Sequence, residues 1–267
     1  LSSQICKILG GTPPDGFTYE LFLDENGEKI SKSRGNGLSV EEWLEYATPE
    51  SLSLYMYNSP RKAKRLYFDA IPRHVDDYLT HLEKFGEQED SKQLENPAWH
   101  IHNGTPPAPE GHVTFGLLLN LASVCNTEDP AVLWGFITRY ASTATPETAP
   151  ILDTLVGNAI AYYRDFVKPN KSYRAPDDKE RAALQELVTS MKAMPADVDA
   201  ETIQTEVYEV GKRHEFENLR DWFKALYEVL LGQSQGPRFG SFAALYGKDE
   251  TVELIGRVLA GESAAAE

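Results

Sequence analysis

Apolar side chains recur at helical spacing along most of this chain, from residue 38 to residue 260. Side chains three and four positions apart share one face of an α-helix, so such stripes predict helices that pack against one another. They predict helices over residues 68–85, 111–125, 130–141, 147–167, 176–193, 199–216, 217–232 and 249–260. We therefore expect a mainly α fold, with an all-helical domain over residues 111–267.

Helix start signals mark the stretch before this domain. Ser39 and Glu42 match a capping box, in which the first and last residues of a four-residue pattern satisfy each other's backbone amides. Thr48 precedes Pro49, the order expected of an N-cap followed by proline in the first turn. We expect a helical connecting region over residues 38–110, which ends in a Pro- and Gly-rich crossing.

The first 37 residues have a different pattern. Residues 19–23 have strand-like side chains, and residues 24–28 supply turn residues before a Lys- and Ser-rich loop over residues 29–37. This order predicts a small α/β remnant over residues 1–37 that holds the loop. Without a preceding fold to supply sheet partners, we expect this strand to be exposed or mobile.

The loop reads Lys29-Ile30-Ser31-Lys32-Ser33-Arg34-Gly35-Asn36-Gly37. The ammonium groups of Lys29 and Lys32 can stabilise negative charge that develops on phosphate in a transition state. Ser31 and Ser33 can add hydroxyl and backbone N–H donors, because consecutive amides in a turn form an anion-binding concavity. The pattern favours a phosphate-binding loop, and a solvated surface turn is the alternative.

The net charge of −15 is unevenly distributed. Residues 1–75 hold nine Lys and Arg against ten Asp and Glu, a net charge of −1, and the other residues carry −14. A basic cluster, residues 61–65, contains Arg61, Lys62, Lys64 and Arg65 beside aromatic residues. Such a patch is what contact with an RNA backbone requires, and a solvated helix end is the alternative.

Several other classes of protein are not favoured. No apolar run is long enough to cross a membrane, and no basic-then-apolar leader opens the chain, so we expect a cytoplasmic protein. Cys6 and Cys125 are too few and too far apart for a disulfide framework. His100 and His102 form an H-x-H pair without a third ligand at clear spacing, so we expect no metal site. Neither a membrane nor DNA is an expected partner.

Residues 236–240, Gly-Pro-Arg-Phe-Gly, indicate a turn between two helices. Arg238 and Phe239 could offer a guanidinium group and a ring for stacking on an unpaired base. In the alternative interpretation the segment is only a connector, and Phe239 is buried.

These segments resemble a known family. Residues 29–33 are similar to the KMSKS signature of class I aminoacyl-tRNA synthetases, with Ile30 in place of Met. Taken together, a longer series resembles class I lysyl-tRNA synthetase, namely residues 29–37, 48–52, 58–64, 68–69, 96–104 and 232–242. The similarity covers essentially the whole chain and corresponds to the C-terminal half of the family.

The resemblance implies an intact enzyme that activates lysine with ATP, carrying Mg²⁺, and transfers it to tRNA. It implies that Lys29 and Lys32 clamp ATP, with Ser31 and Ser33 on the phosphates. Residues 38–110, with the basic cluster, would contact the tRNA stem. The helical remainder, residues 111–267, would bind the anticodon.

The chain also departs from the family. It begins without an initiator Met, and the HIGH element and lysine pocket of the family precede the matching stretch. We therefore expect a fragment that binds tRNA and does not charge it, because positioning ATP needs the opposite wall of the site. The alternative is a stand-alone helical RNA-binding or protein-interaction module derived from a synthetase.

Overall fold

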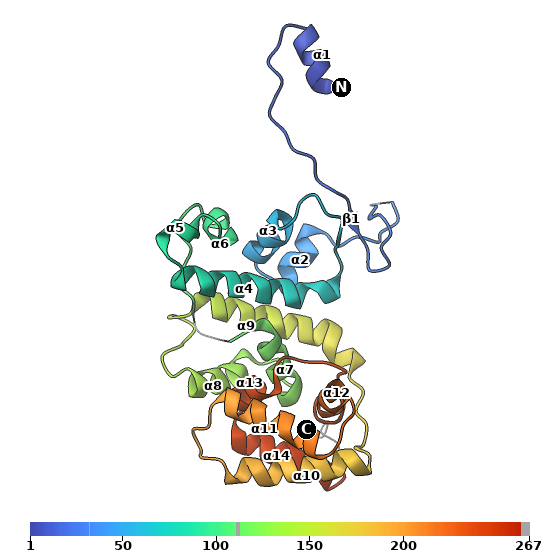
Figure 1. Ribbon diagram of the computed structural model, residues 1–267, viewed down its shortest axis with the longest axis vertical. Helices are drawn as coiled ribbons and strands as arrows, with labels where there is room; N and C mark the ends of the chain where they lie inside the picture. The colour runs from blue at the N-terminus through green and yellow to red at the C-terminus, as the bar shows by residue number, and fades with distance from the viewer. Residues whose placement is uncertain (32, 111–112, 263–267) are drawn as a thin grey trace.

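The computed structural model describes residues 1–31, 33–110 and 113–262. Figure 1 shows its helices in order along the chain. The α-helices are α1 (Ser2–Ile8), α2 (Val40–Tyr46), α3 (Pro49–Tyr57), α4 (Ile71–Glu87), α5 (Asp90–Gln93), α6 (Pro97–Ile101), α7 (Phe115–Cys125), α8 (Pro130–Tyr140), α9 (Pro150–Tyr162), α10 (Asp178–Ala193), α11 (Ala200–Arg213), α12 (Leu219–Leu230), α13 (Phe239–Tyr246) and α14 (Lys248–Leu259).

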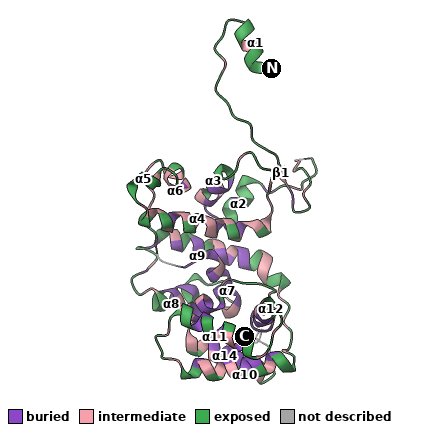
Figure 2. Ribbon diagram, viewed as in Figure 1, coloured by how far each residue is buried: buried purple, intermediate pink, exposed green. Residues whose placement is uncertain are grey.

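The fold class is confirmed, since helices dominate the described residues and the sheet is very small. Its two strands are β1 (Phe22–Leu23) and β2 (Lys64–Arg65), which pair in parallel with Phe22 opposite Lys64. The strand near the N-terminus therefore has one sheet partner, which comes from about 40 residues further along the chain. Before it, residues 1–21 are largely exposed, and α1 contributes no buried residue (Figure 2).

The predicted helix starts are confirmed in atomic detail. The Ser39 hydroxyl accepts a hydrogen bond from the Glu42 amide at 3.1 Å, and the Glu42 carboxylate accepts from the Ser39 amide at 2.7 Å. Thr48 caps α3 by accepting from the amide of Ser51. These caps satisfy backbone donors that a helix end would otherwise leave unpaired.

One hydrophobic core runs from Leu38 to Val258. It joins the helices on both sides of residue 110, because α4 packs on α7 and α2 packs on α9. In Figure 1 α2, α3, α5 and α6 lie on one side of α4, and the helices from α7 onward lie on the other. The proposed division at residue 110 therefore crosses a shared core, and the domain boundaries stay a prediction.

Asp76 links these two parts of the molecule. Its carboxylate oxygens accept hydrogen bonds from the amides of Phe115 and Gly116, at 2.6 Å and 3.2 Å, and so a residue of α4 caps the N-terminus of α7. A carboxylate at that position also lies at the positive end of the helix dipole. Burial raises the pKa of Asp76 to about 6. The two hydrogen bonds lower this pKa, but their effect is smaller than that of burial.

Four of the described α-helices were not predicted, namely the short helices α1, α5 and α6 and the buried helix α13. Residues 236–240 form a turn only as far as Arg238, because Phe239 begins the eight-residue helix α13. Its apolar residues run almost without a polar face, so periodicity alone could not identify a helix that is buried on most sides. The short helix α6 lies inside the Pro-rich crossing, where Asn96 caps it and Pro97 occupies the first turn.

The helix expected over residues 147–167 also differs in detail. Its regular part is α9, and a π-helical stretch (Tyr163–Val167) and a 3-10 turn (Lys168–Asn170) follow.

In the described part of the chain, none of the helices combines the length and the apolar character that crossing a membrane requires.

Candidate functional site: a basic loop beside a basic cluster

Asp24 organises the base of the basic loop. It is 8% exposed, and its Oδ1 accepts hydrogen bonds from the amides of Asn26 and Glu28, at 3.0 Å and 2.8 Å. Its Oδ2 accepts from the side-chain amide of Asn36 at 2.8 Å. The Asn36 hydrogen bond, followed by those from the backbone, lowers the pKa of Asp24, so this carboxylate is ionised at neutral pH.

Asn36 ties the two ends of the loop together. Besides donating to Asp24, its Nδ2 donates to the carbonyl oxygen of Lys29 at 3.3 Å, and its Oδ1 accepts from the amide of Ser31 at 3.0 Å. Both contacts are to the backbone of residues, Lys29 and Ser31, that the motif predicts to bind phosphate. We name the Asp24 and Asn36 pair the loop latch; neither residue was among the site residues predicted from the sequence.

Three of the predicted phosphate-binding residues, Lys29, Ser31 and Ser33, lie among the described residues, and of these Ser31 is half-buried. Lys29 is exposed, and the hydroxyls of Ser31 and Ser33 lie 2.9 Å apart. Arg34 instead forms an ion pair with Glu28 at 2.7 Å. Lys32 lies outside the described residues, so its predicted role rests on the motif alone.

The structure brings the basic cluster to the base of this loop. The pairing of β1 with β2 continues outward, with the Glu20 amide donating to the Pro60 carbonyl at 2.9 Å and the Leu66 amide to the Leu23 carbonyl at 2.8 Å. Gly27, with φ of +83°, faces the guanidinium group of Arg65. Two basic segments that are 30 residues apart in sequence thus form one surface.

The members of the cluster differ in exposure. Arg61, Lys62 and Arg65 are exposed, and within the described ranges no ion pair engages them. Lys64 is half-buried, and its ammonium donates to the carbonyl oxygens of Tyr55, Met56 and Asn58 at 2.5 Å, 3.2 Å and 2.8 Å.

Lys64 therefore serves the end of α3. Its ammonium group satisfies carbonyl oxygens that the helix leaves free, and it lies 4.9 Å from the centre of the Tyr55 ring. Burial lowers the pKa of Lys64. This position supports a structural role for Lys64 and leaves Arg61, Lys62 and Arg65 as the exposed cations of the cluster.

Arg238 and Phe239, which are also neighbours in sequence, likewise differ in exposure. Arg238 is exposed at the start of α13, and Phe239 is 0% exposed and packs near Phe242 and Tyr227. Of the two interpretations of residues 236–240, the structure favours the one with a buried Phe239. Its ring has no face available for stacking on a base.

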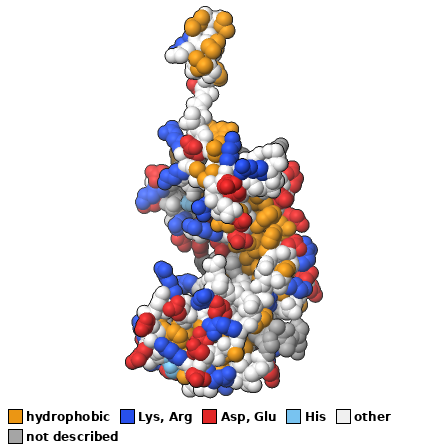
Figure 3. Space-filling view, turned by 90° about the vertical axis from the view of Figure 1, so that its right-hand side faces the viewer, with side chains coloured by type: hydrophobic (Ala, Val, Ile, Leu, Met, Phe, Trp, Pro, Cys, Tyr) orange, Lys and Arg blue, Asp and Glu red, His pale blue; other side chains and the backbone are white. Residues whose placement is uncertain are grey.

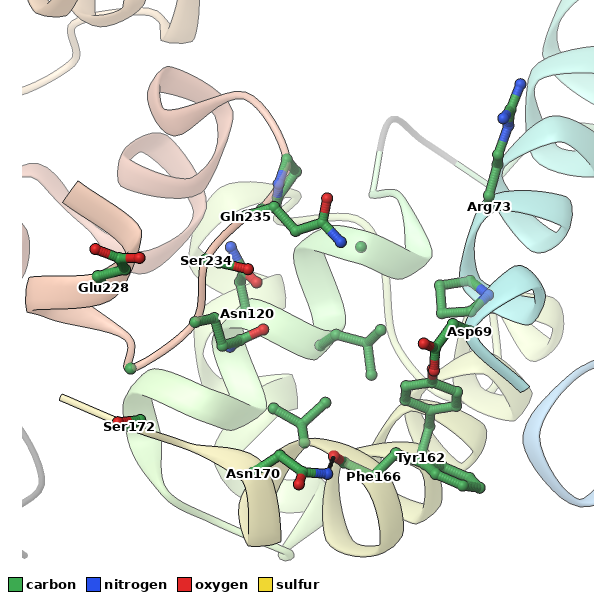
Figure 4. Close-up of a pocket in the computed structure, with 18 of the residues that line it drawn as sticks. Asp69, Arg73, Asn120, Tyr162, Phe166, Asn170, Ser172, Glu228, Ser234 and Gln235 are labelled. Atoms are coloured by element: carbon green, nitrogen blue, oxygen red, sulfur yellow. Dashed lines mark hydrogen bonds between the residues drawn. The ribbon is translucent and has the colours of Figure 1, made fainter. Parts of the chain in front are cut away.

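A second candidate site is a cleft of about 880 Å³. It lies between the start of α4 and residues 231–238, which join α12 to α13, and α7 and the end of α9 complete its walls. Figure 4 shows Asn120, Ser234 and Gln235 on one wall, opposite Asp69 and Tyr162. The surface of Figure 3 is hollowed between the upper and lower parts of the molecule. The cleft could not be predicted from the sequence because its residues come from four separate stretches, residues 69–73, 116–120, 162–174 and 228–237.

The H-x-H pair contributes packing. His102 Nε2 lies 3.0 Å from the Tyr78 hydroxyl, and His100 Nε2 lies 2.9 Å from the Leu94 carbonyl oxygen and stacks on Tyr57. In the described ranges no three His, Cys, Asp or Glu side chains gather in a way that could hold a metal ion. Both cysteines are free thiols.

The chain is similar to two family models and to several curated proteins. Residues 1–105 match the family described as tRNA synthetases class I (K), and residues 140–259 match the anticodon binding domain. The chain is 54% identical over 257 residues to a lysine–tRNA ligase of Rickettsia bellii (strain OSU 85-389), which covers 96% of this chain and 49% of that relative. It is 56% identical over 259 residues to a lysine–tRNA ligase of Roseobacter denitrificans, covering 97% and 49%.

A third relative, the lysine–tRNA ligase of Rickettsia felis, is 52% identical over 257 residues. The chain spans about half the length of these curated relatives, and the matching half is the C-terminal one. Identity above 50% along nearly the whole chain makes the shared family secure for the matched residues.

Proposed function

Because this chain corresponds to the C-terminal half of class I lysyl-tRNA synthetases, we propose that it is the tRNA-recognition portion of a lysine–tRNA ligase. The intact ligase activates lysine with ATP and transfers it to tRNA in the cytoplasm. The observation that carries the proposal is the pairing of β1 with β2, which joins the basic loop to the basic cluster on one surface.

Lysine activation releases pyrophosphate, and the developing negative charge needs cations and N–H donors close by. Lys29 and Lys32 are the proposed clamps, and Ser31 and Ser33 are the proposed phosphate contacts. The loop latch holds the backbone of Lys29 and Ser31 through Asn36, which reduces the reorganisation needed when phosphate binds. The Mg²⁺ of the nucleotide would share this charge neutralisation in the intact ligase.

Arg61, Lys62 and Arg65 are the proposed contacts to the tRNA backbone, and Arg238 offers a further cation from the helical part. Arg61, Lys62 and Arg65 are exposed, as phosphate contacts must be, and they lie next to the proposed ATP site. The chain carries −15 overall, so local clusters of cations have to provide the attraction for an RNA.

The test is binding of unmodified lysine tRNA to this chain during a salt titration. Arg61→Glu, Lys62→Glu and Arg65→Glu combined should weaken binding at least about 100-fold and flatten the salt dependence. The matched control reverses three exposed lysines on the distant helices α10, α11 and α12, namely Lys192, Lys212 and Lys224. Equal losses in both triple variants would contradict the assignment to residues 61–65.

Aminoacylation is expected to need the whole ligase, because the chain matches only 49% of the length of its relatives. We expect the purified chain to bind lysine tRNA without charging it. Lysine incorporation by this chain, with no contaminating ligase present, would contradict that expectation.

A second candidate function is a protein-interaction module. It is favoured by a groove of about 390 Å³ whose lining is mostly apolar and includes exposed Phe17, Tyr19, Met56 and Tyr57. Charge reversal at residues 61–65 that leaves RNA binding unchanged would favour the interaction module.

A further inference from the structure

Three asparagines in this chain directly precede a glycine, namely Asn26, Asn36 and Asn103. Such pairs are chemically labile, because the glycine has no side chain to keep its backbone nitrogen away from the Cγ carbon of the asparagine. Attack by that nitrogen removes the side-chain amide as ammonia. The surroundings of the two reacting groups therefore decide which of the three pairs reacts in the folded chain.

In the first and third pairs the attacking nitrogen is hydrogen-bonded. The amide of Gly27 donates to the Asp24 carbonyl oxygen at 3.0 Å, and the amide of Gly104 donates to the Trp99 carbonyl oxygen at 2.8 Å. The asparagine side chains of both pairs are exposed and make no hydrogen bond within the described ranges. In each of these turns the nitrogen has to leave a backbone hydrogen bond before it can attack.

The pair Asn36-Gly37 has the opposite arrangement. The Gly37 amide donates no hydrogen bond to any described residue, so its nitrogen is free. The Asn36 side chain is held instead, because its Nδ2 donates to Asp24 at 2.8 Å and to the Lys29 carbonyl oxygen at 3.3 Å, and its Oδ1 accepts from the Ser31 amide at 3.0 Å. Only the side chain has to be released for this pair to react.

The structure of the loop depends on both members of this pair. A Cβ at position 37 would lie 2.4 Å from Cγ2 of Ile30, a branched side chain with little freedom to move, so packing requires glycine there. The latch requires asparagine at position 36, because a carboxamide can both donate to a carboxylate and accept from an amide. The contacts that hold the loop closed therefore demand a labile sequence.

In Figure 1 the loop projects from the body of the molecule beside β1, so it can open locally without disturbing the helical core. We propose that Asn36 is a site of spontaneous deamidation, which occurs when the loop opens and then removes the latch permanently. The Gly37 nitrogen bonds to Cγ of Asn36, and the side-chain amide leaves as ammonia with the proton that this nitrogen carried. Water then opens the cyclic imide at either of its carbonyl carbons, which gives aspartate or isoaspartate.

The product cannot form the latch again. A carboxylate at position 36 has no N–H to donate to Asp24 or to the Lys29 carbonyl oxygen, and it repels the ionised carboxylate of Asp24. Isoaspartate also adds a methylene to the main chain next to Gly37, which already lies against Ile30. Deamidation thus leaves the loop open. The reaction needs no ligand, so it is independent of the proposed tRNA binding.

The test is peptide mapping by mass spectrometry during incubation of the whole chain in slightly alkaline buffer. A parallel sample unfolded in guanidinium chloride gives the intrinsic rate of each pair. In the folded parent chain, we expect Asn36 to react more slowly than in the unfolded sample. Asp24→Ala frees the Asn36 side chain and keeps the pair with Gly37, so deamidation at Asn36 should become about tenfold faster, which is 1.4 kcal/mol.

Two controls accompany this variant. Glu25→Ala removes the neighbouring carboxylate, which is exposed and forms no hydrogen bond or ion pair within the described ranges, and it should leave the rate at Asn36 unchanged. Asn103 is the internal reference, because its unchanged rate in Asp24→Ala shows that the rest of the chain is still folded. A rate at Asn36 that is equal in the parent chain and in Asp24→Ala would overturn the proposal. So would a folded parent chain that reacts as fast as the unfolded one.

A second measurement does not depend on Asp24→Ala. Asn36→Asp carries one product of the reaction from the start, and trypsin should cleave it after Lys29 about tenfold faster than the parent chain, again 1.4 kcal/mol. Asn103→Asp, at the exposed pair outside the loop, is the matched control and should be cleaved there at the parent rate. Equal cleavage rates in the two variants would show that deamidation leaves the loop closed, which would overturn the proposal.

Discussion

Single residues in this chain decide whether a basic side chain is available to a ligand. Lys64 and Arg65 are neighbours in sequence, but Lys64 satisfies three carbonyl oxygens at the end of α3 and Arg65 is exposed. The loop latch shows the same principle, because Asn36, which is itself held by the Asp24 carboxylate, contacts the backbone of two loop residues, Lys29 and Ser31. Local hydrogen bonds therefore show which residues of a short segment support the fold and which remain available to a ligand.

Removing the side chain of Asn36 tests the loop latch. Asn36→Ala deletes its contacts to Asp24, Lys29 and Ser31, so we expect the loop to open more often without loss of global stability. Trypsin should then cleave after Lys29 and Arg34 about tenfold faster. This rate increase corresponds to a decrease of about 1.4 kcal/mol in the free energy of loop opening.

Asn26→Ala provides the control for the loop latch. Asn26 lies in the turn that precedes the loop and is exposed, and it contacts Asp24 through its backbone amide, which the substitution keeps. Cleavage rates that are equal in the two variants would show that Asn36 does not hold the loop. In the whole ligase, Asn36→Ala should also lower the rate of ATP–pyrophosphate exchange more than Asn26→Ala does.

Elements in the helical part depend on close approach between backbones. Helix α13 packs on α11, and the amide of Gly240 donates to the side-chain oxygen of buried Gln204 at 2.9 Å. A Cβ on Gly240 would lie 2.2 Å from the carbonyl oxygen of Ala200. That oxygen belongs to the backbone, so the two helices would have to move apart.

Gly240→Ala should therefore lower the free energy of unfolding by about 1–3 kcal/mol, the usual cost of forcing extra atoms into a packed interior. Urea unfolding followed by circular dichroism measures this change. Gly135→Ala is the matched control, because a Cβ on Gly135 in α8 meets no atom within 4 Å. That substitution should stabilise the chain by about 0.5–1 kcal/mol through helix propensity, and equal effects at both positions would contradict the packing argument.

The whole molecule is joined across residue 110 by a shared core and by Asp76, which extends from α4 to cap α7. Desolvation of this carboxyl group raises its pKa to about 6 although two amides donate to it. A carboxyl pKa that is higher in the folded chain means that the folded state binds more protons between pH 4 and pH 6. Its contribution to stability is thus complete below the unfolded pKa and is lost as pH rises through about 6.

Asp76→Asn should remove this part of the pH dependence. From pH 4 to pH 7 the free energy of unfolding of the variant, relative to the parent chain, should increase by up to about 3 kcal/mol, at 1.36 kcal/mol per pKa unit. Urea titrations of both chains at several pH values measure the difference, in which other titrating groups cancel. A difference that stays constant, or that changes in the opposite direction, would show that the two amide hydrogen bonds outweigh burial.

The sequence by itself determined the features that depend on near neighbours. Helical periodicity located most of the long helices, the capping residues Ser39 and Thr48 marked their starts, and the motif at residues 29–33 indicated the family. Capping and periodicity act within one or two turns, so they are visible in a short window of sequence.

Only the tertiary structure decided which of those residues meet. It paired β1 with β2, committed Lys64 to the end of α3, buried Phe239, and built a cleft from segments between residues 69 and 237. These outcomes depend on contacts between residues far apart in the chain, where exposure is set by packing and not by residue type. Asp24, Asn36 and Asn120 escaped prediction for this reason, since an isolated Asp or Asn has the same local signal in a turn, a latch or a binding site.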